Sequence, residues 1–306
     1  MITQKFFITS CAILYSCFIF LAQTASVNQN KYKTQIQAHR GGAAIYPENT
    51  IPAMIHAASI GIPVLELDLQ ISKDGEVIVS HDAFFNHTKA LTPSHDTIPA
   101  QQETQYSYYT MTYDSIRKYD VGSLKNEQFP KRKNISAIVP RVSDLIDCVE
   151  TYTQEKNLPP VSYNIEIKSS PEKDNIFTPD YQTYADICIQ TLLKKKLKNR
   201  LLIQCFDPRT LNYIHQKYPQ IQLSYLVEDY DRTFEEQMAL LNFTPQVYSP
   251  EYHMVTNDLV RKVKKNGMKI IPWTVDTKEE VLRLSDLKVD AIISNKPDSL
   301  KIWLKI

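Results

Sequence analysis

The chain has 306 residues, of which 43% are hydrophobic and 23% are charged, a composition typical of a soluble globular protein. Its formal net charge is +1 and no long basic stripe occurs, so we expect no nucleic-acid partner. The length suits one large α/β domain better than two small domains.

The first 25 residues differ from the rest of the chain. Residues 1–25 carry one lysine near the start, an apolar stretch over 6–21, and small residues just before residue 26. This layout predicts a secretory signal peptide, followed by a polar segment over 26–33. A retained membrane anchor and a lipid-modified Cys11 or Cys17 are the alternatives. We therefore expect an exported protein, periplasmic or extracellular, with no stable membrane span once the signal is removed.

Strand-like and helix-like segments alternate after residue 33. The predicted strands are 35–38, 64–71, 77–80, 162–167, 201–206, 222–227, 246–248, 269–275 and 291–294. The predicted helices are 50–58, 142–155, 181–195, 208–218, 233–241, 258–265, 278–284 and 298–304. About eight strand–helix units in this length predict a TIM (β/α)8 barrel over residues 34–306. The alternative, an open doubly wound sheet, usually carries a glycine-rich phosphate loop, and this chain has only 6 Gly and no GxGxxG motif.

One segment interrupts the alternation. Residues 83–140 are rich in Thr, Tyr, Gln, Ser and Pro and show little periodicity. We interpret them as an insertion after the second strand region, on the side where the strands end. An insertion in that place can cover a pocket.

Polar side chains gather where the predicted strands end. In LELDLQISKDGEVIVSHD, Glu66 and Asp68 project to the same side of a strand, and Glu166 and Lys168 do the same in YNIEIKSS. The carboxyl ends of the strands of a parallel barrel meet at one rim. The predicted rim set holds three carboxylates, two histidines and two cationic side chains: Glu66, Asp68, Glu166, His39, His81, Arg40 and Lys168.

These residue types together suit one kind of reaction. Three carboxylates can share a site if a cation neutralises them, and oxygen ligands select a hard ion such as Ca²⁺ or Mg²⁺. Arginine and lysine suit an anionic oxygen, and histidines transfer protons near neutral pH. The sequence therefore predicts hydrolysis of a phosphate ester that uses one divalent cation and general acid–base catalysis.

Seven motifs also point to a known family. AHRGG, PENT, ELDLQISKDGEVIVSHD, NIEIK, QCFD, PWTV and DAIISNKPD follow one another in an order and spacing that resemble the glycerophosphodiester phosphodiesterase family from about residue 35 onward. The resemblance implies a metal-dependent TIM-barrel enzyme that cleaves glycerophosphodiesters to sn-glycerol 3-phosphate and an alcohol. It implies metal ligands at Glu66, Asp68 and Glu166. It implies a general acid–base pair at His39 and His81.

The resemblance also implies that Arg40 and Lys168 hold the substrate phosphate. Two aromatic residues at strand ends, Phe206 and Trp273, are candidates for the lining of the alcohol pocket, although packing alone explains an aromatic residue there equally well. A small glycerophosphodiester is therefore the expected partner of this site.

The chain departs from the family pattern at a few positions. It has Cys205 where the family usually has serine, Asn295 where it often has aspartate, and His87 near the place of an arginine. These departures put substrate fit in doubt but remove no predicted ligand or catalytic histidine. Glu48 and Asn49 of PENT are expected to fix the first loop and the start of its helix rather than to react.

Several alternatives stay open at this point. The sequence does not assign the base and the acid between the two histidines, nor choose between water and the glycerol 2-hydroxyl as nucleophile. It leaves the choice between Ca²⁺ and Mg²⁺, the alcohol group and the oligomeric state undecided. The rival functions are a phospholipid-directed phosphodiesterase of the phospholipase C or D type and a non-catalytic phosphate-ester binding protein. A barrel amidohydrolase would be expected to show an HxH pair at the first strand, where this chain has HRGG.

Overall fold

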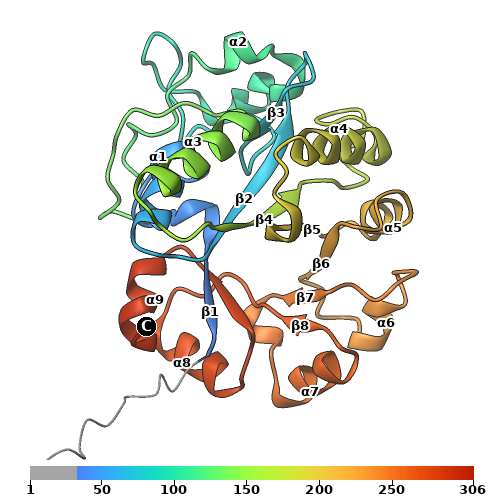
Figure 1. The fold of residues 1–306 in the computed structure, drawn as a ribbon. Helices are drawn as coiled ribbons and strands as arrows, with labels where there is room; N and C mark the ends of the chain where they lie inside the picture. The colour runs from blue at the N-terminus through green and yellow to red at the C-terminus, as the bar shows by residue number, and fades with distance from the viewer. Residues whose placement is uncertain (1–32) are drawn as a thin grey trace, which may run out of the picture. The chain divides into compact units, whose positions relative to one another are not determined.

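The structure is a computed structural model that describes residues 33–306; the predicted signal peptide at 1–25 lies outside the described residues, as does all but the last residue of the polar segment at 26–33. Its main feature is a nearly closed barrel of parallel strands (Figure 1). These strands are β1 (Gln35–Ala38), β2 (Val64–Ile71), β4 (Ser162–Ile167), β5 (Leu201–Cys205), β6 (Gln222–Val227), β7 (Val247–Pro250), β8 (Lys269–Ile270) and β9 (Ala291–Ser294). The predicted TIM barrel is therefore confirmed.

The order of the strands follows the chain around the barrel. Neighbours run β8-β7-β6-β5-β4-β2-β1-β9, and every pair in this order is parallel. Backbone hydrogen bonds from Asp290 N to Ile270 O (3.0 Å) and from Ile293 N to Pro272 O (3.0 Å) join the two ends. All carboxyl ends of the strands therefore meet at one rim.

Helices pack outside the barrel, after the strands that precede them in sequence. They are α1 (Ile51–Ser59), α3 (Val142–Glu155), α4 (Tyr181–Leu193), α5 (Pro208–Lys217), α6 (Phe234–Met238), α7 (Asn257–Lys265), α8 (Lys278–Asp286) and α9 (Pro297–Leu304). Six of them begin at a side chain that accepts a hydrogen bond from a backbone N–H of the first turn. These N-caps are Thr50, Asp180, Asp207, Thr233, Thr256 and Thr277.

Strand β2 shows how the sequence divides the barrel into an apolar outside and a polar inside. Leu65, Leu67 and Leu69 belong to the large hydrophobic core, and Glu66 and Asp68 alternate with them. Both carboxylates are 1% exposed. The two carboxylates therefore do not form a solvated face of the sheet.

The segment after β2 turns back before it leaves the barrel. Strand β3 (Val77–Val79) pairs antiparallel with β2, and the following insertion contains the short helix α2 (Tyr113–Ile116). In Figure 1 the insertion lies above the barrel beside β2 and β3. It has its own small core, centred on Phe85 and Tyr108. The predicted insertion after the second strand region is confirmed, and this apolar cluster gives it a fixed shape.

Two predicted elements are more than two residues shorter than expected. The strand predicted at 269–275 has regular pairing only over Lys269–Ile270, because Pro272 has no N–H to continue the ladder. The helix predicted at 233–241 ends at Met238. Neither difference moves the rim residues to another strand end.

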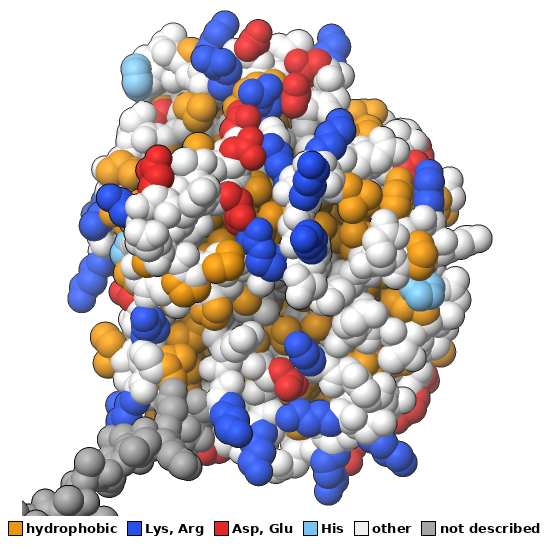
Figure 2. Space-filling view, in the orientation of Figure 1, with side chains coloured by type: hydrophobic (Ala, Val, Ile, Leu, Met, Phe, Trp, Pro, Cys, Tyr) orange, Lys and Arg blue, Asp and Glu red, His pale blue; other side chains and the backbone are white. Residues whose placement is uncertain are grey.

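The surface of the described chain carries charges of both signs. Figure 2 shows Lys and Arg side chains interspersed with Asp and Glu on one face, in keeping with the formal net charge of +1. Within residues 33–306, no helix has the length and apolar character needed to cross a bilayer.

Candidate active site

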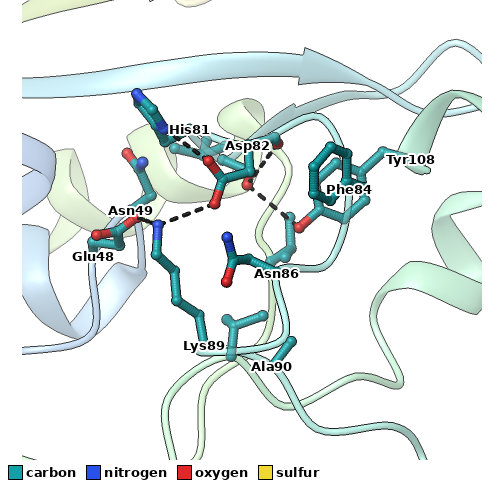
Figure 3. Close-up of a pocket in the computed structure, with 13 residues that line it drawn as sticks. Glu48, Asn49, His81, Asp82, Phe84, Asn86, Lys89, Ala90 and Tyr108 are labelled. Atoms are coloured by element: carbon teal, nitrogen blue, oxygen red, sulfur yellow. Dashed lines mark hydrogen bonds and ion pairs between the residues drawn. The ribbon is translucent and has the colours of Figure 1, made fainter. Parts of the chain in front are cut away.

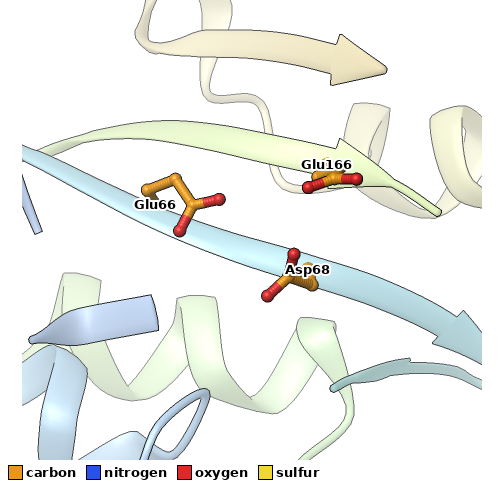
Figure 4. Close-up of side chains that lie close together, drawn as sticks. All are labelled: Glu66, Asp68 and Glu166. Atoms are coloured by element: carbon orange, nitrogen blue, oxygen red, sulfur yellow. The ribbon is translucent and has the colours of Figure 1, made fainter. Parts of the chain in front are cut away.

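Three buried carboxylates come together on two neighbouring strands. Asp68 on β2 lies opposite Glu166 on β4 in the parallel register, and Glu66 is two residues earlier on β2. The three side chains project to one side, toward a shared space (Figure 4), and one carboxylate oxygen from each lies within 4.8 Å of the others. The period of two along each strand and the pairing of β2 with β4 produce this cluster.

Two cationic side chains face the cluster. Arg40 Nε lies 3.4 Å from Asp68 Oδ2, and Lys168 Nζ lies 2.9 Å from Glu166 Oε1 and 3.7 Å from Asp68 Oδ1. Three carboxylates therefore face two fixed positive charges. One negative charge is left without a partner among these side chains, which is costly in a buried place.

The pKa shifts reflect this imbalance. Burial, together with the negative charge of Asp68, raises the pKa of Glu66 well above its usual value. Burial also raises the pKa of Glu166, against the effect of Lys168. Burial alone would raise the pKa of Asp68, but Lys168 and the neighbouring positive charges lower it below its usual range. The cluster therefore disfavours full ionisation unless a further cation is present.

The donor set fits a hard divalent cation. Asp68 Oδ1 is buried and has no hydrogen-bond partner, so one acceptor oxygen of the cluster is unsatisfied. The three side chains that meet here, Glu66, Asp68 and Glu166, offer oxygen ligands only, which suit Ca²⁺ or Mg²⁺ rather than a soft metal. An orphaned buried carboxylate oxygen beside two others is the arrangement that an ion would satisfy.

The HRGG segment forms a tight turn that holds the first strand end against the cluster. Arg40 has a left-handed backbone with φ of 51°, and its N–H donates to Glu66 Oε2 at 2.8 Å. Gly41 also has a positive φ of 80°, and a Cβ there would lie 2.8 Å from Ala53 Cβ. Glycine is therefore required at this position by both conformation and space.

His39 is held by an amide rather than by a carboxylate. Its Nδ1 lies 2.7 Å from Asn295 Oδ1, and Asn295 Nδ2 donates to Asp276 Oδ2 at 2.7 Å. Because a carboxylate only accepts, Asp276 fixes the orientation of the amide, and Asn295 Oδ1 must accept from His39 Nδ1–H. Burial, and then the charge of Arg40, lowers the pKa of His39 to about 3.

His81 is held by a charged network that reaches into the insertion. Its Nδ1 lies 3.0 Å from Asp82 Oδ1. Lys89 donates to Asp82 Oδ2 at 3.0 Å and to Glu48 Oε1 at 2.8 Å, as the dashed lines in Figure 3 show. Glu48 in turn accepts from Arg40 Nη1 at 3.1 Å. One lysine of the insertion therefore links the strand ends that carry His81 and Arg40.

We expect Lys89→Met to lower the free energy of unfolding by about 2 kcal/mol, because it removes the cation that Asp82 and Glu48 share and leaves Arg40 alone to pair with Glu48. Burial alone would raise the pKa of Glu48, but Arg40 and Lys89 lower it from 4.5 to about 2. The ionised Glu48 therefore stabilises the fold above pH 4.5, and this contribution is lost as the pH falls from 4.5 through 2. Urea unfolding should show that the free energy of unfolding falls less between pH 7 and pH 3 in the variant than in the wild type.

The exposed Lys125 of the same insertion provides the matched control for that measurement. Lys125→Met should unfold like the wild type at every pH. Equal stabilities of Lys89→Met and Lys125→Met would contradict a structural role for the network.

Sequence reasoning missed the side chains that orient the cluster. Gln204 Nε2 donates to Glu66 Oε1 at 2.8 Å, and Asn49 Nδ2 donates to Asp68 Oδ2 at 2.8 Å. Asn49 was expected to fix the first loop and the helix start, but Thr50 caps that helix. Gln204 lies near the end of β5 and Asn49 lies just before the N-cap of α1, and the only available signal was that the motifs QCFD and PENT contained them.

Eight of the nine predicted site residues line one cavity of about 270 Å³. Those eight are His39, Arg40, Glu66, His81, Glu166, Lys168, Phe206 and Trp273. Asp68 belongs to the carboxylate cluster with Glu66 and Glu166, which line this cavity. The ring of Phe206 meets that of Trp273 edge to face, with centroids 5.3 Å apart. The structure thus places every predicted residue at one rim, and their chemical roles stay predictions.

Comparison with known proteins agrees with this geometry. The model of the glycerophosphoryl diester phosphodiesterase family matches residues 39–299. A glycerophosphodiester phosphodiesterase of Caldanaerobacter subterraneus subsp. tengcongensis is 28% identical over 268 residues, which are 88% of this chain and 96% of that protein.

Two solved structures share the fold. One is a Silicibacter pomeroyi protein named for the glycerophosphoryl diester phosphodiesterase family. It aligns with a TM-score of 0.79 and 24% identity, over 90% of this chain and 94% of that one. An Oleispira antarctica phosphodiesterase in complex with the product sn-glycerol-3-phosphate aligns with a TM-score of 0.68 and 20% identity. That alignment covers 89% of this chain and 97% of the other.

Proposed function

The chain belongs to the glycerophosphoryl diester phosphodiesterase family, and from this premise we propose that it hydrolyses glycerophosphodiesters to sn-glycerol 3-phosphate and an alcohol with the help of one divalent cation. The observation that carries the proposal is the joint placement of the buried carboxylate cluster, two histidines and two cationic side chains around one cavity. The product named in the complex of the Oleispira antarctica phosphodiesterase supports this substrate class.

Glu66, Asp68 and Glu166 would hold the cation. When bound there, a Ca²⁺ or Mg²⁺ ion supplies Lewis-acid stabilisation of negative charge on the phosphate. Arg40 and Lys168 project into the same cavity and bind the phosphate oxygens as fixed positive charges. The phosphorus is thereby held between the two histidines.

The different partners of the two histidines support a division of roles between them. Asn295 accepts from His39 Nδ1–H, so the free Nε2 of neutral His39 is the atom that removes a proton from the attacking hydroxyl. Asp82 Oδ1 accepts from Nδ1–H of His81, which orients the ring and leaves its Nε2 for the substrate. We propose that His81 Nε2–H protonates the oxygen of the leaving alcohol. The same assignment holds whether the hydroxyl belongs to water or to the glycerol 2-position.

Asn295→Asp should move the acidic limb of the pH profile. A carboxylate beside Nδ1 favours the imidazolium form, so the pKa of His39 rises from its lowered value by about one unit or more. Because the base acts when neutral, the acidic limb of kcat/KM should shift to higher pH by the same amount. A profile of kcat/KM between pH 3 and pH 8 covers the lowered pKa of His39 and measures this shift, and an unmoved acidic limb would argue against His39 as the base.

The proposed function is tested by a coupled assay for sn-glycerol 3-phosphate. Glycerophosphocholine and the corresponding intact lysophospholipid are compared as substrates, each with and without a chelator. We expect product from the glycerophosphodiester that disappears with chelator and returns when Ca²⁺ or Mg²⁺ is added. Faster cleavage of the lysophospholipid would favour a phospholipid-directed enzyme, and binding without product would favour a non-catalytic protein.

A further inference from the structure

A chain of buried side-chain amides runs through the interior of the barrel to the carboxylate cluster. Asn164 Nδ2 donates to Gln37 Oε1 at 2.8 Å and to Gln204 Oε1 at 2.9 Å. Gln204 Nε2 in turn donates to Glu66 Oε1 at 2.8 Å. The three amide side chains lie on β1, β4 and β5, and each is at most 3% exposed. Because amides buried this deeply are costly without hydrogen bonds, the chain has a defined arrangement.

Gln204 reaches Glu66 across an intervening strand. In the parallel register Gln204 on β5 lies beside Glu166 on β4, whereas Glu66 is on β2, on the other side of β4. Asn164 is the residue of β4 that lies beside Glu66, and its amide contacts the oxygen of Gln204. Asn164 therefore holds the side chain of Gln204 on its path over β4.

The orientation of the Gln204 amide depends on Asn164. The two ends of a glutamine amide are almost equal in shape, so hydrogen bonds decide which end faces Glu66. A carboxylate that binds a cation accepts hydrogen bonds and does not donate them, so it needs the N–H end. Asn164 provides this orientation because it donates to Gln204 Oε1, and no other described group does so.

The opposite end of the Asn164 amide has no such role. Asn164 Oδ1 is buried and has no hydrogen-bond partner. An unsatisfied buried acceptor destabilises the fold, so stability alone does not explain an amide at this position. The useful part of the side chain is its pair of N–H donors, which fix Gln204 and are themselves held by Gln37.

We infer that Asn164 is a positioning residue for the cation site, because it orients Gln204 and thereby Glu66. The inference rests on the proposed function, since it needs the cation that the carboxylate cluster would hold. Gln204 Nε2 donates to one oxygen of Glu66 and Arg40 N–H donates to the other, each at 2.8 Å. A ligand fixed at both oxygens before the ion arrives loses less freedom on binding, so the loss of its support weakens the site.

The test measures the binding of Mn²⁺ by isothermal titration calorimetry, which needs no turnover. Asn164→Leu keeps the approximate shape of the side chain and removes both donors. Its dissociation constant for Mn²⁺ should be about tenfold higher than that of the wild type, as is usual when a metal ligand loses its support. Ser224→Ala is the matched control, because Ser224 lies beside Gln204 in the register of β5 and β6 and its buried hydroxyl has no hydrogen-bond partner. This control should bind Mn²⁺ as the wild type does.

A double variant distinguishes this route from a general loosening of the barrel. If Asn164 acts through Gln204, Asn164→Leu should add little once Gln204→Leu is present. The double variant should then bind Mn²⁺ within about threefold of Gln204→Leu alone. Thermal unfolding with chelator checks that each variant is folded. If Asn164→Leu does not fold, Asn164→Ser, which shortens the side chain and removes the amide donors, replaces it with the same expectations.

Each result of this test decides one question. Equal dissociation constants for the wild type and Asn164→Leu would overturn the inference and leave the proposed function standing. Losses that multiply in the double variant, or a loss in Ser224→Ala as large as that in Asn164→Leu, would also overturn it. A wild-type protein that binds no Mn²⁺ would overturn the cation site of the proposed function, and the inference with it.

Discussion

His39→Ala should lower kcat by about 10²–10⁴, the usual effect of removing a general base. The structure supports this expectation, because His39 lines the cavity while Asn295 holds its Nδ1. No other described side chain hydrogen-bonds the ring of His39, so the fold should survive its loss. The coupled assay gives kcat, and urea unfolding checks that the variant remains folded.

His95 offers a matched control for this variant. It lies exposed in the insertion and outside the catalytic cavity. His95→Ala should therefore keep the wild-type rate. A folded His39→Ala variant that turns over at the wild-type rate would remove the acid–base mechanism proposed for the site.

Glu66→Gln should abolish most of the activity without weakening the fold in the absence of metal. The loss of one ligand charge should lower kcat by about 10³-fold, which corresponds to several kcal/mol of transition-state stabilisation. Burial and the charge of Asp68 raise the pKa of Glu66, so its ionised form destabilises the metal-free fold at neutral pH. That cost begins as the pH rises above 4.5 and is complete above the raised pKa of the folded state. Glutamine cannot ionise, so the variant does not carry this cost.

Thermal unfolding separates these two effects. With chelator at pH 7, Glu66→Gln should unfold at the wild-type temperature or above it. With Ca²⁺ or Mg²⁺ added, the wild type should gain stability, because a bound cation favours the folded state, and the variant should gain much less. Glu127→Gln, at an exposed position of the insertion, is the control. If the added ion raised the unfolding temperature of Glu66→Gln as much as that of the wild type, the ion would bind at another place.

Much of the fold could be predicted because its signals are local. The alternation of Leu65 with Glu66 fixes which face of β2 is polar, and the pairing of strand with helix along the chain predicts a parallel barrel. The same alternation places Glu66, Asp68 and Glu166 on the inside of neighbouring strands. Residues that share a strand face or a strand end were therefore brought together correctly.

The partners of the two histidines could not be predicted in the same way. Asn295 is 256 residues from His39 in sequence, and no local pattern relates them. Lys89 belongs to an insertion whose shape depends on aromatic packing around Phe85 and Tyr108, which has no regular period. The proposed division of acid and base rests on these contacts. The signal peptide predicted at 1–25, and with it export, stays a prediction.

The central claim is that Glu66, Asp68 and Glu166 share one divalent cation. Manganese is a hard ion that oxygen ligands accept, and its anomalous scattering locates it in a crystal. An anomalous difference map from crystals grown with Mn²⁺ should show one strong peak within bonding distance of all three carboxylates. A map in which manganese binds at another place, with no peak between these carboxylates, would contradict the account.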